Sequence, residues 1–182
     1  STLVQGGGGN TSAKTADGKY MYIKASGTAL KDMSGKRGWR RLDMQAVLDI
    51  VNDERLPKVE PGRRESEVVS RLLLSCRDEF GEGSRPSVEA HLHALLKRYV
   101  IHLHPNAVGA YVNCTEGRER IDNLFADEKY PPLWVPYVDP GLLLAVKIRR
   151  LMDKYEQEHR RGAEVLILQK HGLFVTADKA GR

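Results

Sequence analysis

Two histidines stand within an apolar run that ends at a proline, in the stretch VIHLHP over residues 100–105. Branched apolar residues favour a strand, and Pro105 would end it because proline lacks a backbone donor. Successive side chains of a strand point to opposite faces, so His102 and His104 would share one face. From this pair alone, imidazoles packed in a core with satisfied nitrogens are favoured over a metal site.

Helical and strand patterns alternate around this stretch. Apolar spacing predicts helices over residues 42–51, 66–80, 87–99 and 142–161, with a shorter one over 106–113. Alternating or apolar runs predict strands over residues 19–27 and 100–104, and two more within 164–176 that meet at residues 170–172. The chain has 182 residues, which is enough for one domain with a sizeable core. The alternation predicts a layered α/β domain.

The charge pattern excludes few partners. The net charge is +5, and the basic residues are interleaved with acidic ones. The densest basic cluster, GKRGWRR over residues 35–41, is interpreted as a solvated loop, with a phosphate or nucleic-acid contact as the alternative. No nucleic-acid-binding motif accompanies it, so we expect no nucleic-acid partner.

The cysteines, the hydropathy and the chain ends predict the cellular compartment and the extent of the protein. Cys76 and Cys114 lack metal-ligand spacing and are expected to be buried free thiols in a reducing compartment. No transmembrane run or signal peptide is evident, so we expect a cytoplasmic protein without a membrane partner. The chain opens on a glycine-rich stretch and closes just after a predicted strand, and we therefore expect an excerpt that lacks N- and C-terminal elements.

A third histidine and a glutamate extend the histidine pair. His171 lies at the turn between the last two predicted strands, and three imidazoles with an open position are typical of catalytic zinc. Glu89 falls in the first turn of the helix over 87–99, which would pack antiparallel on the histidine strand. A carboxylate there is a fourth ligand or a general acid/base, or is simply favoured by the helix dipole. His93, one turn further, would orient Glu89 or a ligand, or is an ordinary helix residue.

Glycine and small hydroxyl residues gather in three separate stretches, GGGGNTS, ASGT and RPS. Glycine lets backbone N–H groups approach an anion, and serine, threonine and asparagine add donors, so the set suits a phosphate. A flexible loop explains a glycine run equally well. Neither a P-loop nor a dinucleotide-binding fingerprint matches.

Five blocks in this order resemble the class II aldolase/adducin family: GGGGNTSAK, IKASGTAL, RPSVEAHLH, VIHLHPNAV and ILQKHGLFV. They run from Gly6 to Val175, and the opening is most similar to the rhamnulose-1-phosphate aldolase branch with its fusions to a dehydrogenase domain. The resemblance implies one class II aldolase-like domain over residues 1–182. It also implies a three-layer α/β/α fold around a central mixed, mostly antiparallel sheet.

The resemblance assigns roles by position. Zinc, or another divalent transition metal, would be held by His102, His104 and His171, and Glu89 would be the catalytic acid/base. The phosphate cradle of the family falls on Gly9, Asn10, Ser26, Gly27 and Ser87. A second serine of the family's cradle is replaced here by Val88.

The implied activity is that of a zinc-dependent aldehyde-lyase in carbohydrate metabolism. It would cleave a phosphorylated ketose to dihydroxyacetone phosphate and an aldehyde, as a homotetramer with sites at subunit boundaries. A sugar-phosphate 4-epimerase and a methylthioribulose-phosphate dehydratase of the same family are the alternatives, and a metal-free adducin-head-like binding module is a third. In all the enzymes we expect Ile101 and Leu103 to pack into the core, and His102 and His104 to face out of it into the metal cleft.

Overall fold

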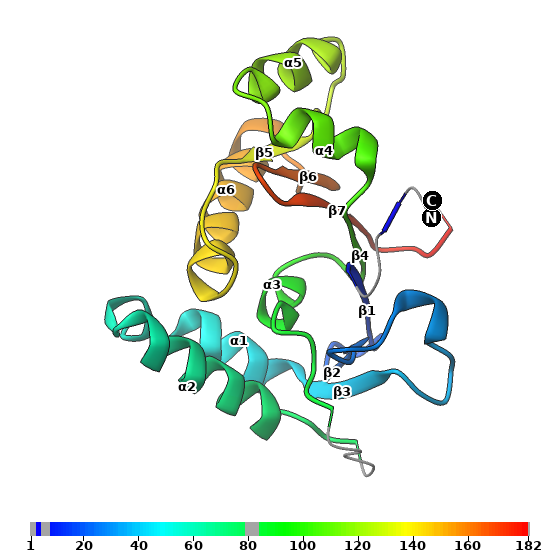
Figure 1. The fold of residues 1–182 in the computed structure, drawn as a ribbon, viewed down its shortest axis with the longest axis vertical. Helices are drawn as coiled ribbons and strands as arrows, with labels where there is room; N and C mark the ends of the chain where they lie inside the picture. The colour runs from blue at the N-terminus through cyan, green and yellow to red at the C-terminus, as the bar shows by residue number, and fades with distance from the viewer. Residues whose placement is uncertain (1–2, 5–7, 79–83, 182) are drawn as a thin grey trace.

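The computed structural model describes residues 3–4, 8–78 and 84–181, and within these ranges its centre is a seven-stranded sheet (Figure 1). Across the sheet the strands follow in the order β3 (Trp39–Asp43), β2 (Tyr20–Lys24), β1 (Asn10–Lys14), β4 (Tyr99–Leu103), β7 (Gly172–Ala177), β6 (Val165–Leu168) and β5 (Leu133–Val135). Neighbouring strands are antiparallel except for β5 and β6, which are parallel. The expected mixed, mostly antiparallel sheet is confirmed. Gly6 and Gly7 of the glycine-rich opening lie outside the described residues.

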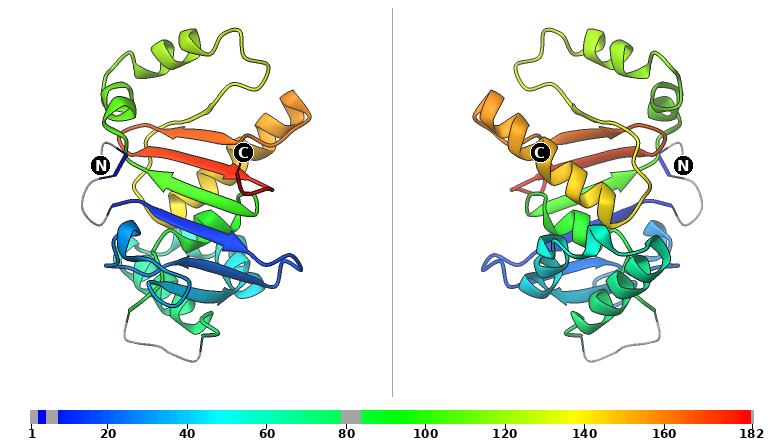
Figure 2. Two further views of the ribbon diagram at one scale, coloured as in Figure 1. Left: turned by 90° about the vertical axis from the view of Figure 1, so that its right-hand side faces the viewer. Right: turned by 90° about the vertical axis from the view of Figure 1, so that its left-hand side faces the viewer.

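Helices cover both faces of this sheet. They are α1 (Met44–Asn52), α2 (Pro61–Leu74), α3 (Ala90–Ala94), α4 (Asn106–Val112), α5 (Gly117–Leu124) and α6 (Leu142–His159). The inner face is covered by α1, α2, α3 and α6, whereas α4 and α5 pack on the outer face beside β5 and β6 (Figures 1 and 2). The three-layer arrangement is confirmed. None of the helices in the described ranges combines the length and apolar character needed to cross a bilayer.

The core lies between the sheet and the inner helices. Ile23 and Leu42 pack against α1 and α2, and Val100, Leu166 and Phe174 pack against α6, all of them fully buried. Burying each of these side chains contributes roughly 1.5–3 kcal/mol relative to its exposed state. The sheet is therefore a firm support for whatever its strand ends carry.

Strand β4 presents the opposite faces from those expected. Val100 and His102 point to the inner face, where the ring of Phe174 stacks on His102 at a centroid distance of 4.1 Å. Ile101 points to the outer face and is 46% exposed, and Leu103 is half-buried. The expectation that Ile101 packs into the core while His102 faces out of it is wrong. The reason is that β1 and α3 line this end of the inner face with polar groups, which suit an imidazole.

The basic cluster over residues 35–41 is only partly a solvated loop. Its last three residues begin β3, and Arg40 is 8% exposed. Its Nε lies 2.5 Å from Oδ2 of Asp78, and a buried guanidinium requires such a carboxylate partner. The local sequence could not show this pair because Asp78 lies far along the chain.

Two helices differ in length from the patterns. Helix α2 begins at Pro61, because Glu60 caps it by accepting hydrogen bonds from the N–H groups of Gly62 and Arg63. Residues 79–80 of the expected helix lie outside the described residues. Helix α3 has only five residues, because the chain must turn back into β4 at Tyr99.

Candidate metal and phosphate site

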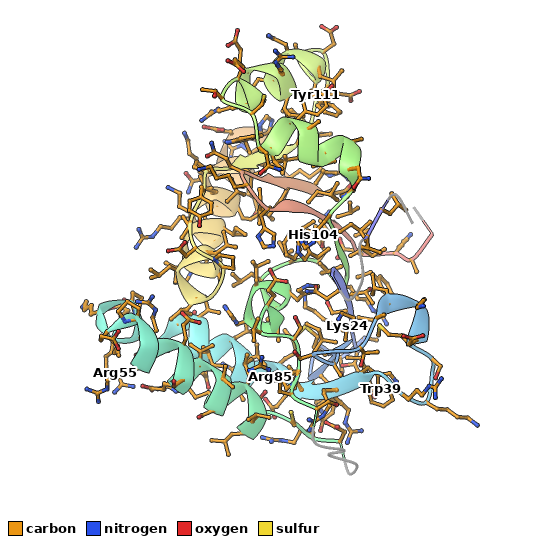
Figure 3. The ribbon with its side chains drawn as sticks, in the orientation of Figure 1. Lys24, Trp39, Arg55, Arg85, His104 and Tyr111 are labelled. Carbon is orange, nitrogen blue, oxygen red and sulfur yellow. The ribbon has the colours of Figure 1, made fainter. Side chains whose placement is uncertain are left out.

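Strand pairing brings the three histidines together. Strands β4 and β7 are antiparallel with Leu103 opposite Leu173, so the turn that precedes β7 lies at the end of β4. His102 belongs to β4, His104 follows it, and His171 lies in that turn. Their ligand nitrogens all lie within 4.8 Å of one another, and His104 is drawn at the end of β4 in Figure 3.

Hydrogen bonding and burial prepare these rings for a metal. His102 donates from Nδ1 to the carbonyl of Leu173 at 2.9 Å, so its Nε2 carries the lone pair that can bind a metal. Burial lowers the pKa of His102 to about 4, although the charge of Glu89 opposes the shift, and burial also lowers the pKa of His104. Both rings are therefore neutral at neutral pH, which is the form that binds metals.

Two glycines permit the close approach of neighbouring chain segments to these ligands. A Cβ at position 172 would lie 2.5 Å from Cδ2 of His104 and equally close to the carbonyl oxygen of Leu103. Gly9 has a φ of +71°, and a Cβ there would lie 2.7 Å from the carbonyl oxygen of His102. Any other residue at these positions would displace a histidine-bearing segment.

The donor set fits a divalent transition metal. Nε2 of His102 and Nε2 of His104 are 2.9 Å apart, close to the separation of about 3.3 Å between two nitrogens on tetrahedral zinc. Oε2 of Glu89 lies 3.7 Å from Nε2 of His102, and Oε1 lies 3.6 Å from Nε2 of His171. Within the described part of the chain, the buried Oε1 has no hydrogen-bond partner. Three imidazoles and a carboxylate thus face one point, a combination that suits zinc.

Asn10 connects this cluster to the loops around it. Asn10 pairs with His102 in the β1–β4 register, and its Nδ2 donates to Oε2 of Glu89 at 2.7 Å and to Oγ of Ser87 at 3.2 Å. Glu89 is the residue that precedes α3. The start of this helix and the end of the histidine strand therefore meet at one edge, as the antiparallel packing predicts.

The residues predicted to cradle a phosphate come from loops that run side by side. The N–H of Ser26 donates to the carbonyl of Arg85 at 2.8 Å, and the N–H of Ser87 donates to the carbonyl of Lys24 at 3.0 Å. Gly27 lies in this loop with a φ of +83°. Gly9, Asn10, Ser26, Gly27 and Ser87 thus come to the same edge of the sheet. Val88, which replaces a serine of the resembling family, is 41% exposed.

Sequence reasoning missed Lys24. This residue ends β2, is 4% exposed, and donates from Nζ to the carbonyl of Thr28 at 2.6 Å (Figure 3). Burial lowers the pKa of Lys24 while the charge of Glu89 raises it, so the two side chains are electrostatically coupled. The available signal was a lysine directly before the Ala-Ser-Gly loop, at the end of an alternating strand.

His93 is placed beside the histidine cluster rather than against Glu89. Its Nδ1 lies 2.8 Å from Oγ of Ser12, and its ring packs edge-on against Phe174 at 5.4 Å. Phe174 in turn stacks on His102. His93 therefore supports the cluster through the aromatic ring between them.

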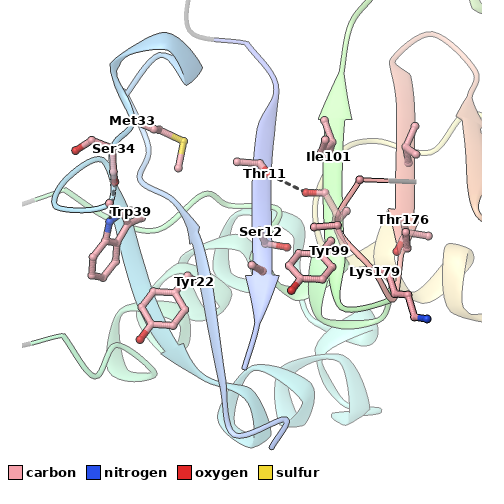
Figure 4. A pocket seen from close by; sticks show the side chains of 17 residues that line it. Thr11, Ser12, Tyr22, Met33, Ser34, Trp39, Tyr99, Ile101, Thr176 and Lys179 are labelled. Carbon is pink, nitrogen blue, oxygen red and sulfur yellow. Dashed lines mark hydrogen bonds between the residues drawn. The ribbon is translucent and has the colours of Figure 1, made fainter. Parts of the chain in front are cut away.

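The outer face of the sheet carries a separate hollow of about 520 Å³ (Figure 4). Tyr22, Trp39, Tyr99 and Ile101 give it a largely apolar lining, and Thr11 bonds the carbonyl of Val100 beside it. None of the described residues that line it is a histidine or an acid. The histidine cluster and Glu89 are therefore separate from this hollow.

Sequence comparisons identify the family of the chain and one curated relative. The family model described as Class II Aldolase and Adducin N-terminal domain matches residues 1–182. The "Uncharacterized oxidoreductase YuxG" of Bacillus subtilis (strain 168) is 28% identical over 180 residues, which cover 94% of this chain and 24% of that protein. The chain thus spans about a quarter of the length of this curated relative.

Two solved structures show the likeness in three dimensions. The N-terminal class II aldolase domain of a conserved protein from Thermoplasma acidophilum is 27% identical with a TM-score of 0.75, over 98% of this chain and 77% of that one. An L-fuculose 1-phosphate aldolase is 15% identical with a TM-score of 0.59, over 97% of this chain and 68% of that one. At this identity the second comparison shows the fold alone.

Proposed function

The chain belongs to the class II aldolase and adducin N-terminal domain family, and we propose that it is a zinc-dependent aldehyde-lyase acting on a phosphorylated ketose. The observation that carries the proposal is the convergence of His102, His104 and His171 with the carboxylate of Glu89. The products would be dihydroxyacetone phosphate and an aldehyde. The likeness in fold to an L-fuculose 1-phosphate aldolase supports this choice of reaction.

The reaction requires one proton to leave an oxygen and one to reach a carbon. Zinc held by the imidazoles supplies Lewis-acid stabilisation of the negative charge that develops on the ketose oxygens. When the C3–C4 bond breaks, the C4 hydroxyl loses its proton and becomes the aldehyde carbonyl, and the electron pair stays on the ketose fragment. The carboxylate of Glu89, held by Asn10, is placed to accept the proton that the C4 hydroxyl releases and to return it to C3, so that it ends as the carboxylate it began as.

The neighbouring donors suit the phosphate of such a substrate. The hydroxyls of Ser26 and Ser87 can donate hydrogen bonds, the amide of Asn10 holds the Ser87 oxygen in place, and Lys24 supplies a buried positive charge. Asn10 contacts Glu89, which lies 3.7 Å from His102, so these donors lie only one side chain away from the metal ligands. This spacing favours a phosphate carried on the carbon next to the ketose carbonyl, as in a ketose 1-phosphate.

The proposal is tested with a panel of ketose 1- and 5-phosphates, using product mass as the readout. We expect cleavage into two fragments by the zinc-loaded protein. We expect a loss of about 10²-fold or more in kcat for Glu89→Gln, because it removes the proton carrier, with zinc retained. Unchanged mass with inverted stereochemistry would instead assign an epimerase, and loss of water a dehydratase. If none of these substrates is turned over, the chain would instead be assigned as a non-catalytic binding module.

The family resemblance also extends the proposal to a homotetramer whose sites lie at subunit boundaries. Sedimentation velocity tests this part independently of turnover. We expect a single species of about four chains, and a monomer would contradict it.

A further inference from the structure

Strand β1 contacts α3 and the residues that flank it through three side chains. The inner-face side chains of β1 are Asn10, Ser12 and Lys14, which alternate along the strand. Asn10 bonds the carboxylate of Glu89 before α3 begins, and Ser12 bonds Nδ1 of His93, the fourth of its five residues. Lys14 bonds the carbonyl groups where the helix ends.

Lys14 closes the C-terminal end of α3. Its ammonium donates to the carbonyls of His93 at 3.0 Å and Lys97 at 2.7 Å, and also to that of Leu96. His93 lies near the end of α3, whereas Leu96 and Lys97 lie in the segment that follows it, so one ammonium holds the helix and the following segment together. Burying an ammonium is costly unless oxygens replace its water, and these three carbonyls do so.

A helix this short depends on such contacts. Five residues of helix are unstable by themselves in water, so packing and side-chain bonds decide where α3 lies. Strand β1 is a firm reference, because it pairs with β4 over four residues and one of these pairs joins Asn10 to His102. The same strand therefore fixes the histidines on one side and α3 on the other.

We propose that Lys14 is a positioning residue for Glu89: by tying the end of α3 to β1, it sets where the Glu89 carboxylate lies relative to His102 and His171. The inference rests on the proposed function, in which Glu89 moves a proton. It adds a residue that contacts neither substrate nor metal in that scheme. The effect is on kcat because misplacing a catalytic group by about 1 Å costs about 10²-fold in rate.

The test compares three variants in the full chain loaded with zinc. Lys14→Met removes the charge and the donors while keeping an unbranched stem, and Lys14→Arg restores a cation. Thr11→Val is the matched control, because Thr11 lies on the same strand and bonds the carbonyl of Val100 from the outer face. Zinc content, kcat and KM are measured for each, and a crystal structure of Lys14→Met gives the distance from Glu89 to His102.

We expect kcat of Lys14→Met to fall by about tenfold or more with KM and zinc content unchanged, and Lys14→Arg to recover most of it. The Thr11→Val variant should match the wild type. An unchanged kcat, or a kcat that falls only in step with zinc content, would overturn the proposal. If Lys14→Met does not fold, Lys14→Gln replaces it, because it also removes the charge, with the same kcat-specific loss expected.

The crystal structure separates this inference from the proposed function. If the wild type cleaves no ketose phosphate, the proposed function fails. The position of Glu89 still decides the inference: a displaced carboxylate in Lys14→Met supports it, and an unmoved carboxylate overturns it.

Discussion

Gly172 and His104 lie so close together that a Cβ at position 172 would come within 2.5 Å of the His104 ring. The same Cβ would lie equally close to the carbonyl oxygen of Leu103, which precedes this histidine. The absence of a side chain at Gly172 is thus part of the histidine cluster. Strand β7 begins at Gly172, so the hairpin that presents His171 also makes room for His104.

Gly172→Ala is expected to weaken metal binding. The added methyl group must push His104 or the β4 backbone aside, at a cost of about 1–3 kcal/mol, so the zinc dissociation constant should rise about tenfold. Gly109→Ala is the matched control, because a Cβ there meets no other atom within 4 Å. Competition with a chromophoric chelator measures both. Equal zinc affinity in the two variants would show that His104 does not bind the metal.

Raising the pH above about 8 is expected to lower kcat, because Lys14 loses its proton. Burial lowers its pKa from 10.5 to about 8, and Asp178 opposes the shift. His93, Lys97 and Arg98 are the other ionisable residues in contact with it: Lys14 donates to the carbonyls of His93 and Lys97, and Arg98 donates to the carbonyl of Lys14. As Lys14 loses its proton above about pH 8, its hold on α3 weakens, so the kcat of the wild type should fall. Lys14→Arg stays charged, and its pH–rate profile should lack this fall.

The free energy of unfolding should rise over the same pH range in which kcat falls. Between about pH 8 and 10.5 the unfolded chain keeps the proton that the folded chain has lost. The free energy of unfolding that depends on Lys14 therefore rises with pH. The free energy of unfolding, measured with urea, should rise for the wild type relative to Lys14→Met as the pH increases through this range. Parallel stability curves would mean that Lys14 titrates normally.

Asp78→Asn is expected to destabilise the fold through Arg40. Both side chains are at least 88% buried, since 9% and 12% of their areas are exposed. Removing the charge of one partner of a buried ion pair costs about 3–5 kcal/mol. Asp122→Asn, in an exposed pair with Arg118, should change the free energy of unfolding by at most about 0.5 kcal/mol. Similar urea midpoints for both variants would contradict a buried role for Arg40.

The fold was predictable where side chains alternate or repeat in a simple way. The hairpin around His171 and the long helix α6 follow such patterns. Strand β1 was missed because its inner face is polar, so Asn10, Ser12 and Lys14 break the apolar alternation that marks a strand. Strand β3 was missed because Arg40 takes an inner position that only its distant partner makes tolerable.

The members of the site were predictable as residue types, but their surroundings were not. The pattern around the three histidines and Glu89 anticipated that they meet at one point. The face of β4 was predicted in reverse, because nothing local shows that the inner surface is polar at this end. Lys14 could not be predicted for a similar reason, since its partners are backbone carbonyls distant in sequence.

Metal content is the most direct test of the three-histidine site. Elemental analysis of the purified chain, after dialysis against zinc-containing and then zinc-free buffer, should find about one divalent ion per chain. His102→Ala should lose it, whereas His159→Ala, in a helix where the ring packs on Tyr155, should retain it. A wild type that holds no transition metal, or a His102→Ala variant that holds as much as His159→Ala, would contradict the metal centre on which the proposed reaction depends.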